Sequence, residues 1–332
     1  CALPIFCNMT RTLLFLVGFL GALMGSHCAA QPAADYPSRP IRMIVPYPPG
    51  GSTDIIARTL NGRLSALMKQ QLVIDNRAGG GGNLGHELAA RATPDGYTLL
   101  IAISAITTNP AVSARASYDP TKDFTPLMMI ARSPYRLVIY PGVTATTMQE
   151  FIALGRAKPG SMNFGSAGAG SAVHLAAELL LRQTGVRMTH VPYKGSGPAM
   201  VDLIAGQIQM VLGGTLSTAP HIKTGRARAL AVTSLKRRTD APELPTLNET
   251  VAPGYEAFEW FAVFAPAGVP KRIVDRLHAE LIKAANDTEV KDRLIANGMD
   301  FVGGTPAQLA DTVKRDYAKW SKLIKETGLK AD

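Results

Sequence analysis

The most informative stretch of this sequence is Ile41-Arg42-Met43-Ile44-Val45-Pro46-Tyr47-Pro48-Pro49-Gly50-Gly51-Ser52-Thr53-Asp54. Its apolar first part predicts a buried parallel strand, and apolar residues spaced by about 3.6 positions after Asp54 predict a helix. Ser, Thr and Asp at the start of that helix are good N-caps, because their side-chain oxygens accept free backbone N–H groups. The prolines stiffen the turn, while the glycines let a ligand approach the backbone. Such a turn favours a small anion, and an ordinary strand–helix loop is the alternative.

The composition restricts the kind of partner. The chain has 332 residues, 46% of them hydrophobic and 18% charged, with a formal net charge of +10. This length and composition allow one large core or two modest ones. The densest basic cluster is only Lys236-Arg237-Arg238, without interleaved aromatic residues. Nucleic acid is therefore not expected as a partner, and the positive charge favours attraction of small acidic solutes.

Residues 1–34 have the pattern of a secretory signal peptide. Arg11 precedes an apolar run at 13–24, and small residues follow it; the run is too short to be a good membrane span. We expect cleavage after Ala30 or Ala34 and export to the periplasm, without a lipid anchor. The three cysteines all lie in this leader, so no disulfide is expected in the mature protein: Cys1, Cys7 and Cys28.

The next segments repeat a strand, a glycine-rich turn and a helix. A strand at 71–76 precedes glycines at 79–85, and a strand at 97–102 ends near Ser104. The glycines fit G-x-G-x-x-G. A dinucleotide site also requires an acid at the end of the following strand, but here the acid, Asp75, precedes the glycines and the following strand has none at its end. No cofactor is therefore expected. An α/β enzyme that uses these loops for a nucleotide or phosphate remains an alternative.

The second half of the chain repeats the pattern, which predicts a second sheet. Polar, glycine-rich loops again follow short apolar strands, at the edge where open α/β sheets bind ligands. We expect the chain to leave the first sheet near residue 134 and the apolar run 258–264 to return to it. We therefore predict two lobes, 35–134 plus 258–332 and 135–257, each a mainly parallel sheet flanked by helices, with two hinge crossings.

The sequence lacks the common catalytic and metal-binding patterns. It has no G-x-S-x-G elbow, no Walker A motif and no pair of histidines at metal-ligand spacing. We predict neither a catalytic set nor a metal site. Asp54 and His174 are expected in capping or core roles. The Gly, Ser and Thr residues that gather at the strand ends are typical of binding without catalysis.

Short motifs occur along the chain from Tyr36 onward. They are Tyr36-Pro37-Ser38-Arg39-Pro40-Ile41, Pro46 to Asp54, Asn76-Arg77-Ala78-Gly79-Gly80, Pro94-Asp95-Gly96-Tyr97-Thr98-Leu99-Leu100, Tyr118-Asp119-Pro120, Val191-Pro192-Tyr193-Lys194-Gly195, Leu230-Ala231-Val232-Thr233-Ser234 and Phe264-Ala265-Pro266-Ala267-Gly268. Together they resemble the Bug/TctC family, the periplasmic solute receptors of tripartite tricarboxylate transporters. The resemblance implies a two-lobed binding protein of type II topology that closes on a small carboxylate and delivers it to membrane transporter subunits. A monomer is expected, and a sensory receptor for a signalling partner is an alternative.

The resemblance also implies which residues bind the ligand, through backbone N–H groups and hydroxyls. They are Tyr47, Gly51, Ser52, Thr53 and Ser104 from the first lobe, and Ser166, Gly168, Gly170, Ser171 and Tyr193 from the second. Two places depart from the family pattern. Gly213-Gly214 stands where many relatives have an acid that could face a ligand ammonium, which predicts a ligand without an amine. The residues Ile106-Thr107-Thr108 also differ, so contacts there are not assigned.

Overall fold

The structure, a computed structural model, describes residues 36–113 and 116–329. The predicted signal peptide, its cleavage sites and the three cysteines lie outside the described residues. The chain divides into two units, residues 1–38 and 39–332, and the two sheets described below belong to the second unit. None of the described helices is both long enough and apolar enough to cross a membrane.

The first sheet has six strands in the order β11-β4-β10-β3-β1-β2. β1 pairs in parallel with β2 and β3, whereas β10 is antiparallel to β3 and β4. The strands are β1 (Ile41–Val45), β2 (Leu72–Asn76), β3 (Thr98–Ile103), β4 (Phe124–Pro134), β10 (Phe258–Pro266) and β11 (Asp300–Phe301).

The second sheet has five strands in the order β7-β6-β8-β5-β9. β6 is parallel to β7 and β8, and β5 is antiparallel to β8 and β9. Its strands are β5 (Arg136–Ile139), β6 (Asn163–Ser166), β7 (Thr189–Pro192), β8 (Met210–Gly213) and β9 (Arg228–Val232).

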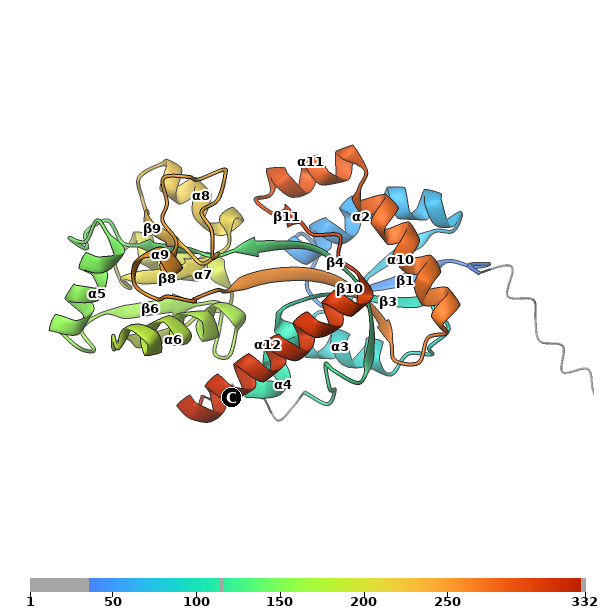
Figure 1. Cartoon of the computed structure of the whole chain (residues 1–332), viewed down its shortest axis with the longest axis horizontal. Helices are drawn as coiled ribbons and strands as arrows, with labels where there is room; N and C mark the ends of the chain where they lie inside the picture. The colour runs from blue at the N-terminus through green and yellow to red at the C-terminus, as the bar shows by residue number, and fades with distance from the viewer. Residues whose placement is uncertain (1–35, 114–115, 330–332) are drawn as a thin grey trace, which may run out of the picture. The chain divides into compact units, whose positions relative to one another are not determined.

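Helices cover the six-stranded sheet on both faces (Figure 1). On one face, α3, α4 and α12 pack side chains such as Ala89, Ile106 and Leu309 against Trp260 and Phe264 of β10. On the other, α2 and α10 pack against each other and against β1 and β4. The helices are α2 (Ser52–Met68), the short 3₁₀ helix η2 (Gly80–Gly82), α3 (Asn83–Ala90), α4 (Ala105–Val112), α10 (Lys271–Ala285), α11 (Thr288–Ala296) and α12 (Pro306–Thr327). We call this sheet and its helices lobe 1.

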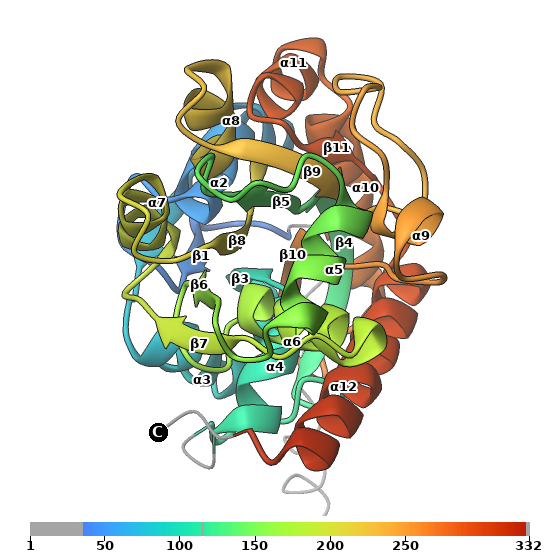
Figure 2. The ribbon, with the colours of Figure 1, turned by 90° about the vertical axis from the view of Figure 1, so that its left-hand side faces the viewer.

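The five-stranded sheet is likewise covered on both faces, and Figure 2 looks at it from its own side of the unit. Leu137 and Ile139 of β5 face one core, with α5, α6 and α9, and Val138 between them faces the other, with α7 and α8. This alternation follows from the two-residue period of a strand. The helices are α5 (Met148–Ala157), α6 (Ala172–Thr184), α7 (Ser196–Ile204), α8 (Thr215–Lys223) and α9 (Leu247–Thr250). We call this sheet and its helices lobe 2.

The chain crosses between the lobes in two places. β4 passes into β5 with only Tyr135 between them, and the segment after β9 returns as β10. β4 and β10 run side by side along this path (Figure 1). Near its C-terminal end, α12 also packs Trp320 and Leu323 with Leu175 of α6. The predicted two-lobed α/β fold is confirmed.

One detail of the prediction is wrong: the sheets are mixed rather than mainly parallel. A parallel pair needs a crossover, usually a helix, that carries the chain back to the starting edge. β4 instead runs directly into β5, and β10 arrives in lobe 1 by a crossing. β5 and β10, the strands that enter their sheets by a crossing, therefore run in the reverse direction. In contrast, β1, β2 and β3 keep the parallel order, and so do β6, β7 and β8.

Candidate ligand-binding site

The loop between β1 and α2 is held by the carboxylate of Asp54. It accepts hydrogen bonds from the Gly50 N–H at 2.9 Å, from Arg58 Nε at 2.8 Å and from Asn76 Nδ2 at 3.0 Å. Although burial opposes ionisation, these bonds lower the pKa of Asp54 to about 2. The helix N-cap is Gly51, and no side chain caps it. Asp54 therefore does not cap α2 as the sequence suggested; its ionised carboxylate fixes the preceding turn instead.

Tyr47, in the same loop, stands against the glycine-rich segment after β2. Its Oη lies 3.4 Å from the Gly81 carbonyl oxygen, and a Cβ on Gly82 would approach that Oη to 3.0 Å. Burial, and then the nearby Glu259, raises the pKa of the Tyr47 phenol. The phenol is therefore a neutral hydrogen-bond donor at physiological pH. The glycines in this segment let the backbone pack closely against the tyrosine.

In lobe 2, the loop after β6 is closed by its own serines. Ser166 Oγ donates to the Gly168 carbonyl at 2.9 Å and also lies 2.7 Å from His190 Nε2. Ser171 Oγ donates to the same carbonyl at 2.7 Å and accepts from the His174 N–H at 3.4 Å. Both hydroxyls are thus engaged inside the protein, and so is the Gly168 N–H, which donates to Ser166 Oγ at 3.1 Å.

His174 stabilises that loop through a hydrogen bond to its backbone. Its Nδ1 accepts a hydrogen bond from the Gly170 N–H at 2.9 Å, and its ring stacks on His190 with centroids 3.6 Å apart. Burial, and then the neighbouring His174, lowers the pKa of His190 to about 4. Both rings lie beside Phe164. His174 therefore has the structural role expected for it, and His190 is neutral near pH 7.

Tyr193 also uses its hydroxyl internally. Its Oη donates to Asp202 at 2.7 Å, and burial together with Asp202 raises its pKa to about 12. A Cβ on Gly165 would come within 3.2 Å of the ring. Its contribution to a site is thus an aromatic surface rather than a free hydroxyl.

The two lobes meet around Glu259, on the crossing strand β10. A Cβ built on Gly214, at the start of α8 in lobe 2, would lie 3.9 Å from Glu259 Oε2. The same carboxyl raises the pKa of two nearby phenols electrostatically, that of Tyr47 from lobe 1 and that of Tyr135 at the other crossing. Ser104, at the end of β3, lies beside Tyr135. These five residues form what we call the central cluster.

In the central cluster, Ser104 has a hydroxyl that is available for a further hydrogen bond. Only 2% of the residue is exposed, yet its Oγ has no well-formed hydrogen bond among the described residues. A buried hydroxyl without a partner costs free energy, so this hydroxyl would gain by donating a hydrogen bond to a ligand. Ser104 was assigned to the site from the sequence, and the structure surrounds it with groups from both crossings.

Two members of the central cluster were missed from the sequence. Tyr135 and Glu259 belong to the crossings rather than to the loops at strand ends, where the sequence placed the ligand. A signal was present: Glu259 is the one charged residue in the apolar run Phe258–Phe264. The residues Gly51, Ser52 and Thr53 are respectively exposed, half-buried and buried. Their ligand contacts stay a prediction, as do those of the lobe 2 loop.

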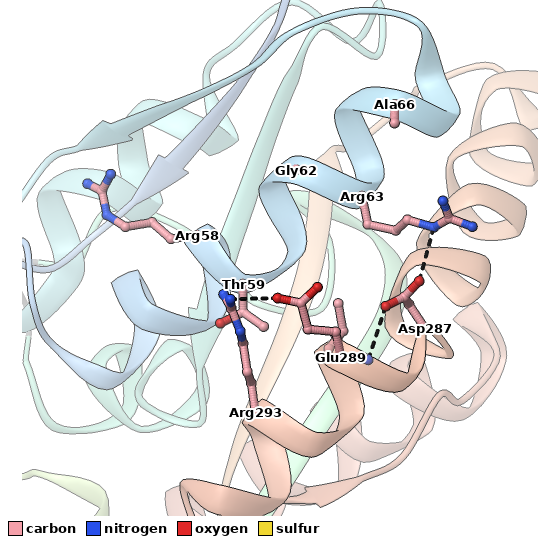
Figure 3. A pocket seen from close by; sticks show the side chains of 9 residues that line it. Arg58, Thr59, Gly62, Arg63, Ala66, Asp287, Glu289 and Arg293 are labelled. Carbon is pink, nitrogen blue, oxygen red and sulfur yellow. Dashed lines mark hydrogen bonds and ion pairs between the residues drawn. The ribbon is translucent and has the colours of Figure 1, made fainter.

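A surface hollow of about 430 Å³ lies elsewhere, between α2 and α11 (Figure 3). Arg63 pairs with Asp287 at 3.3 Å and Arg293 with Glu289 at 2.6 Å. Arg58 points away from these pairs (Figure 3) and binds Asp54. All three arginines on its wall are thus paired with acids. Within residues 36–113 and 116–329, no group of three or more His, Cys, Asp or Glu side chains could hold a metal ion.

Comparison with known proteins gives a consistent result. The sequence profile described as "Tripartite tricarboxylate transporter family receptor" (TctC) matches residues 56–329. BugT of Bordetella pertussis is 38% identical over 326 residues, which cover 97% of this chain and 99% of BugT. A protein encoded between tcbD and tcbE in Pseudomonas sp. (strain P51) is 40% identical over 318 residues, 96% of this chain and 95% of that protein.

Solved structures are similar as well. An R. palustris protein with adipate is 36% identical, with a TM-score of 0.78, over 89% of this chain and 99% of that one. The periplasmic binding protein BugD is 32% identical, with a TM-score of 0.76, over 89% and 99%. MatC from Rhodopseudomonas palustris with bound malate is 29% identical, with a TM-score of 0.74, over 87% and 100%.

Proposed function

This chain belongs to the TctC family of tripartite tricarboxylate transporter receptors, and we propose that it traps one small organic carboxylate between its lobes and passes it to the membrane subunits of such a transporter. Family and structural relatives are periplasmic binding receptors. The chain is accordingly a receptor and not an enzyme.

The observation that carries the carboxylate proposal is the buried Ser104 hydroxyl in the central cluster, which has no well-formed hydrogen bond to any residue that the structure describes. Ser104 and the Tyr47 phenol are donors that lie close to the junction of the two lobes. A hydrogen bond to a charged oxygen contributes roughly 1.5–3 kcal/mol. The summed free energy of a few such bonds is enough for micromolar affinity after the free-energy costs of association are subtracted.

The relatives indicate which ligands to try first. The solved relatives hold adipate in one case and malate in another. Both are short dicarboxylates, and each can present one carboxylate to each lobe. We propose that the β1–α2 loop with Ser52 and Thr53 holds one end, and that the loop of lobe 2 that contains Gly168 and Gly170 holds the other. The remaining proposed contacts are Tyr47, Gly51, Ser104, Ser166, Ser171 and Tyr193.

The setting of this receptor is part of the proposal. We place it in the periplasm as a monomer after removal of residues 1–34, without lipid anchoring. Mass spectrometry of the exported protein identifies its first residue, and light scattering measures its oligomeric state.

Calorimetry on the purified protein tests the function. We expect malate, adipate or a related dicarboxylate to bind with micromolar affinity, and ATP and NAD not to bind. Binding of a nucleotide in the absence of any carboxylate binding would favour the enzyme alternative. Mass spectrometry of small molecules that co-purify with the protein would identify the natural ligand.

A further inference from the structure

Glu259 occupies an unusual place in the fold. Its neighbours in β10 point to the other face: Trp260 packs in the lobe 1 core and donates to Asp316 at 2.8 Å, while Phe258 lies under the Arg132 guanidinium. The Glu259 side chain therefore leaves the strand on the side of the central cluster. Its Oε2 would lie 3.9 Å from a Cβ built on Gly214 across the lobe junction.

The Glu259 carboxyl is unpaired within the described part of the chain. Among the residues that the structure describes, none donates a hydrogen bond to Glu259 or forms an ion pair with it. The titratable groups near it are two phenols, Tyr47 from the β1–α2 loop and Tyr135 from the first crossing. Of the other members of the central cluster, Ser104 contributes a hydroxyl and Gly214 contributes backbone atoms. Asp316, with Arg315 and Lys319, belongs to α12 on the Trp260 side.

A carboxyl in such surroundings favours its neutral form. Solvent reaches part of the residue, but the group lies deep among protein atoms. Burial without a compensating cation raises the pKa of Glu259 to about 7. An ionised Glu259 would also repel a bound carboxylate, whereas the neutral acid can donate a hydrogen bond to it.

We propose that Glu259 binds the ligand carboxylate as a neutral acid, donating its O–H to a carboxylate oxygen, so that ligand capture takes up one proton. This inference rests on the proposed function. The proton comes from the buffer, is held in the Glu259–ligand hydrogen bond and returns to solvent on release; no covalent bond of the ligand changes. The alternative is a ligand ammonium. The structure disfavours it, because Gly213 and Gly214 offer no second carboxylate to share a cation.

Calorimetry in two buffers of different ionisation enthalpy measures proton uptake directly. With malate and adipate as probes at about pH 8, we expect wild-type protein to take up nearly one proton per ligand bound. Between about pH 6.5 and about pH 8.5, the dissociation constant should rise at least about tenfold, because the neutral acid becomes scarce. The variant Glu259→Gln keeps the shape and a donor, so its binding should show no proton uptake and little dependence on pH.

Each outcome has a distinct meaning. Binding without proton uptake in the wild type overturns this inference and leaves the receptor function intact. Failure of malate, adipate, succinate and citrate all to bind overturns the proposed function itself. Tighter binding of glutamate than of malate that is lost in Glu259→Gln shows that the carboxyl holds an ammonium, and overturns the inference. If Glu259→Gln does not fold, the wild-type buffer comparison still decides.

Discussion

Thr233 and Tyr135 bind each other where the two crossings of the chain meet. The Tyr135 N–H donates to Thr233 Oγ1 at 2.8 Å, and the Thr233 N–H donates to the Tyr135 carbonyl at 3.0 Å. The same hydroxyl donates to the Ala257 carbonyl at 2.7 Å, just before β10. Thr233 is fully buried. The Thr233 side chain therefore connects the two chain segments that cross between the lobes.

Replacing this hydroxyl tests its contribution. Thr233→Val keeps the shape but leaves the Tyr135 N–H and the Ala257 carbonyl without this partner. We expect the free energy of unfolding to fall by about 2 kcal/mol, the usual cost of unpaired buried polar groups. Thr233→Ser keeps the hydroxyl and is the matched control. Urea unfolding measures both, and equal stability of the two variants would contradict the assignment.

The pH dependence of stability tests the burial of Glu259. Its folded pKa of about 7 lies above the ordinary value of 4.5, so the folded state holds its proton longer than the unfolded state. Stability should therefore fall as the pH rises from about 4.5 to about 7, by at most about 3 kcal/mol in total, and stay lower above that range.

In Glu259→Gln this loss should vanish, so the variant should be more stable than the wild type at about pH 8. Glu243→Gln, at an exposed position, is the control and should keep the wild-type dependence. Thermal melts across the range measure all three proteins. A variant whose melting curve follows the wild type at every pH would show that Glu259 is well solvated.

The first loop is tested by removing its hydroxyls. Ser52→Ala together with Thr53→Ala should weaken carboxylate binding at least about tenfold, since two bonds to a charged oxygen are lost. Thr59→Ala on the same helix is the control, because its hydroxyl bonds the Ile55 carbonyl. Calorimetry measures affinity, and melting shows whether the double variant is folded. Unchanged affinity would remove this loop from the site.

Asp54 should matter because it fixes the turn. Asp54→Ala leaves the Gly50 N–H without its partner and removes one of the two acceptors of Asn76 Nδ2, so we expect a loss of about 1–3 kcal/mol. Because the pKa of Asp54 is lowered to about 2, this stabilisation is present above the ordinary carboxyl range and is lost as the pH falls toward 2. Asp275→Ala, which breaks an exposed pair with Lys271, should change stability little. Urea unfolding of both variants measures the difference.

Two glycines should respond in opposite directions. Gly82 has φ +101°, and a Cβ there would meet Tyr47 Oη at 3.0 Å. Gly82→Ala should therefore strain the turn, displace Tyr47 and lower stability by about 1–2 kcal/mol. Gly62 lies inside α2 with nothing within 4 Å of its Cβ position, so Gly62→Ala should raise stability by roughly 0.5–1 kcal/mol. Thermal melts compare the two variants, and a shift of the same sign in both would contradict these roles.

Local patterns in the sequence were enough to place the first loop. The apolar run of β1, the stiff turn and the helix from Ser52 follow from periodicity and turn chemistry over neighbouring residues. The same holds for β3, which leads to Ser104, and for the glycine-rich turns of lobe 2. The family motifs are continuous stretches as well, which is why the receptor class could be recognised before the structure was known.

The reversed strands and the centre of the site were decided by tertiary structure alone. Glu259 is remote in sequence from Tyr47, and only the return of β10 between β3 and β4 brings them together. In the same way, the hydroxyls of Ser166 and Tyr193 look free in sequence but are taken by His190 and Asp202 in the fold. Periodicity in the sequence predicts which face of a helix or strand is buried. Which distant residues lie together on that buried face depends on how the chain crosses between the lobes. Burial together with these neighbours then determines whether a group is charged and what it hydrogen-bonds.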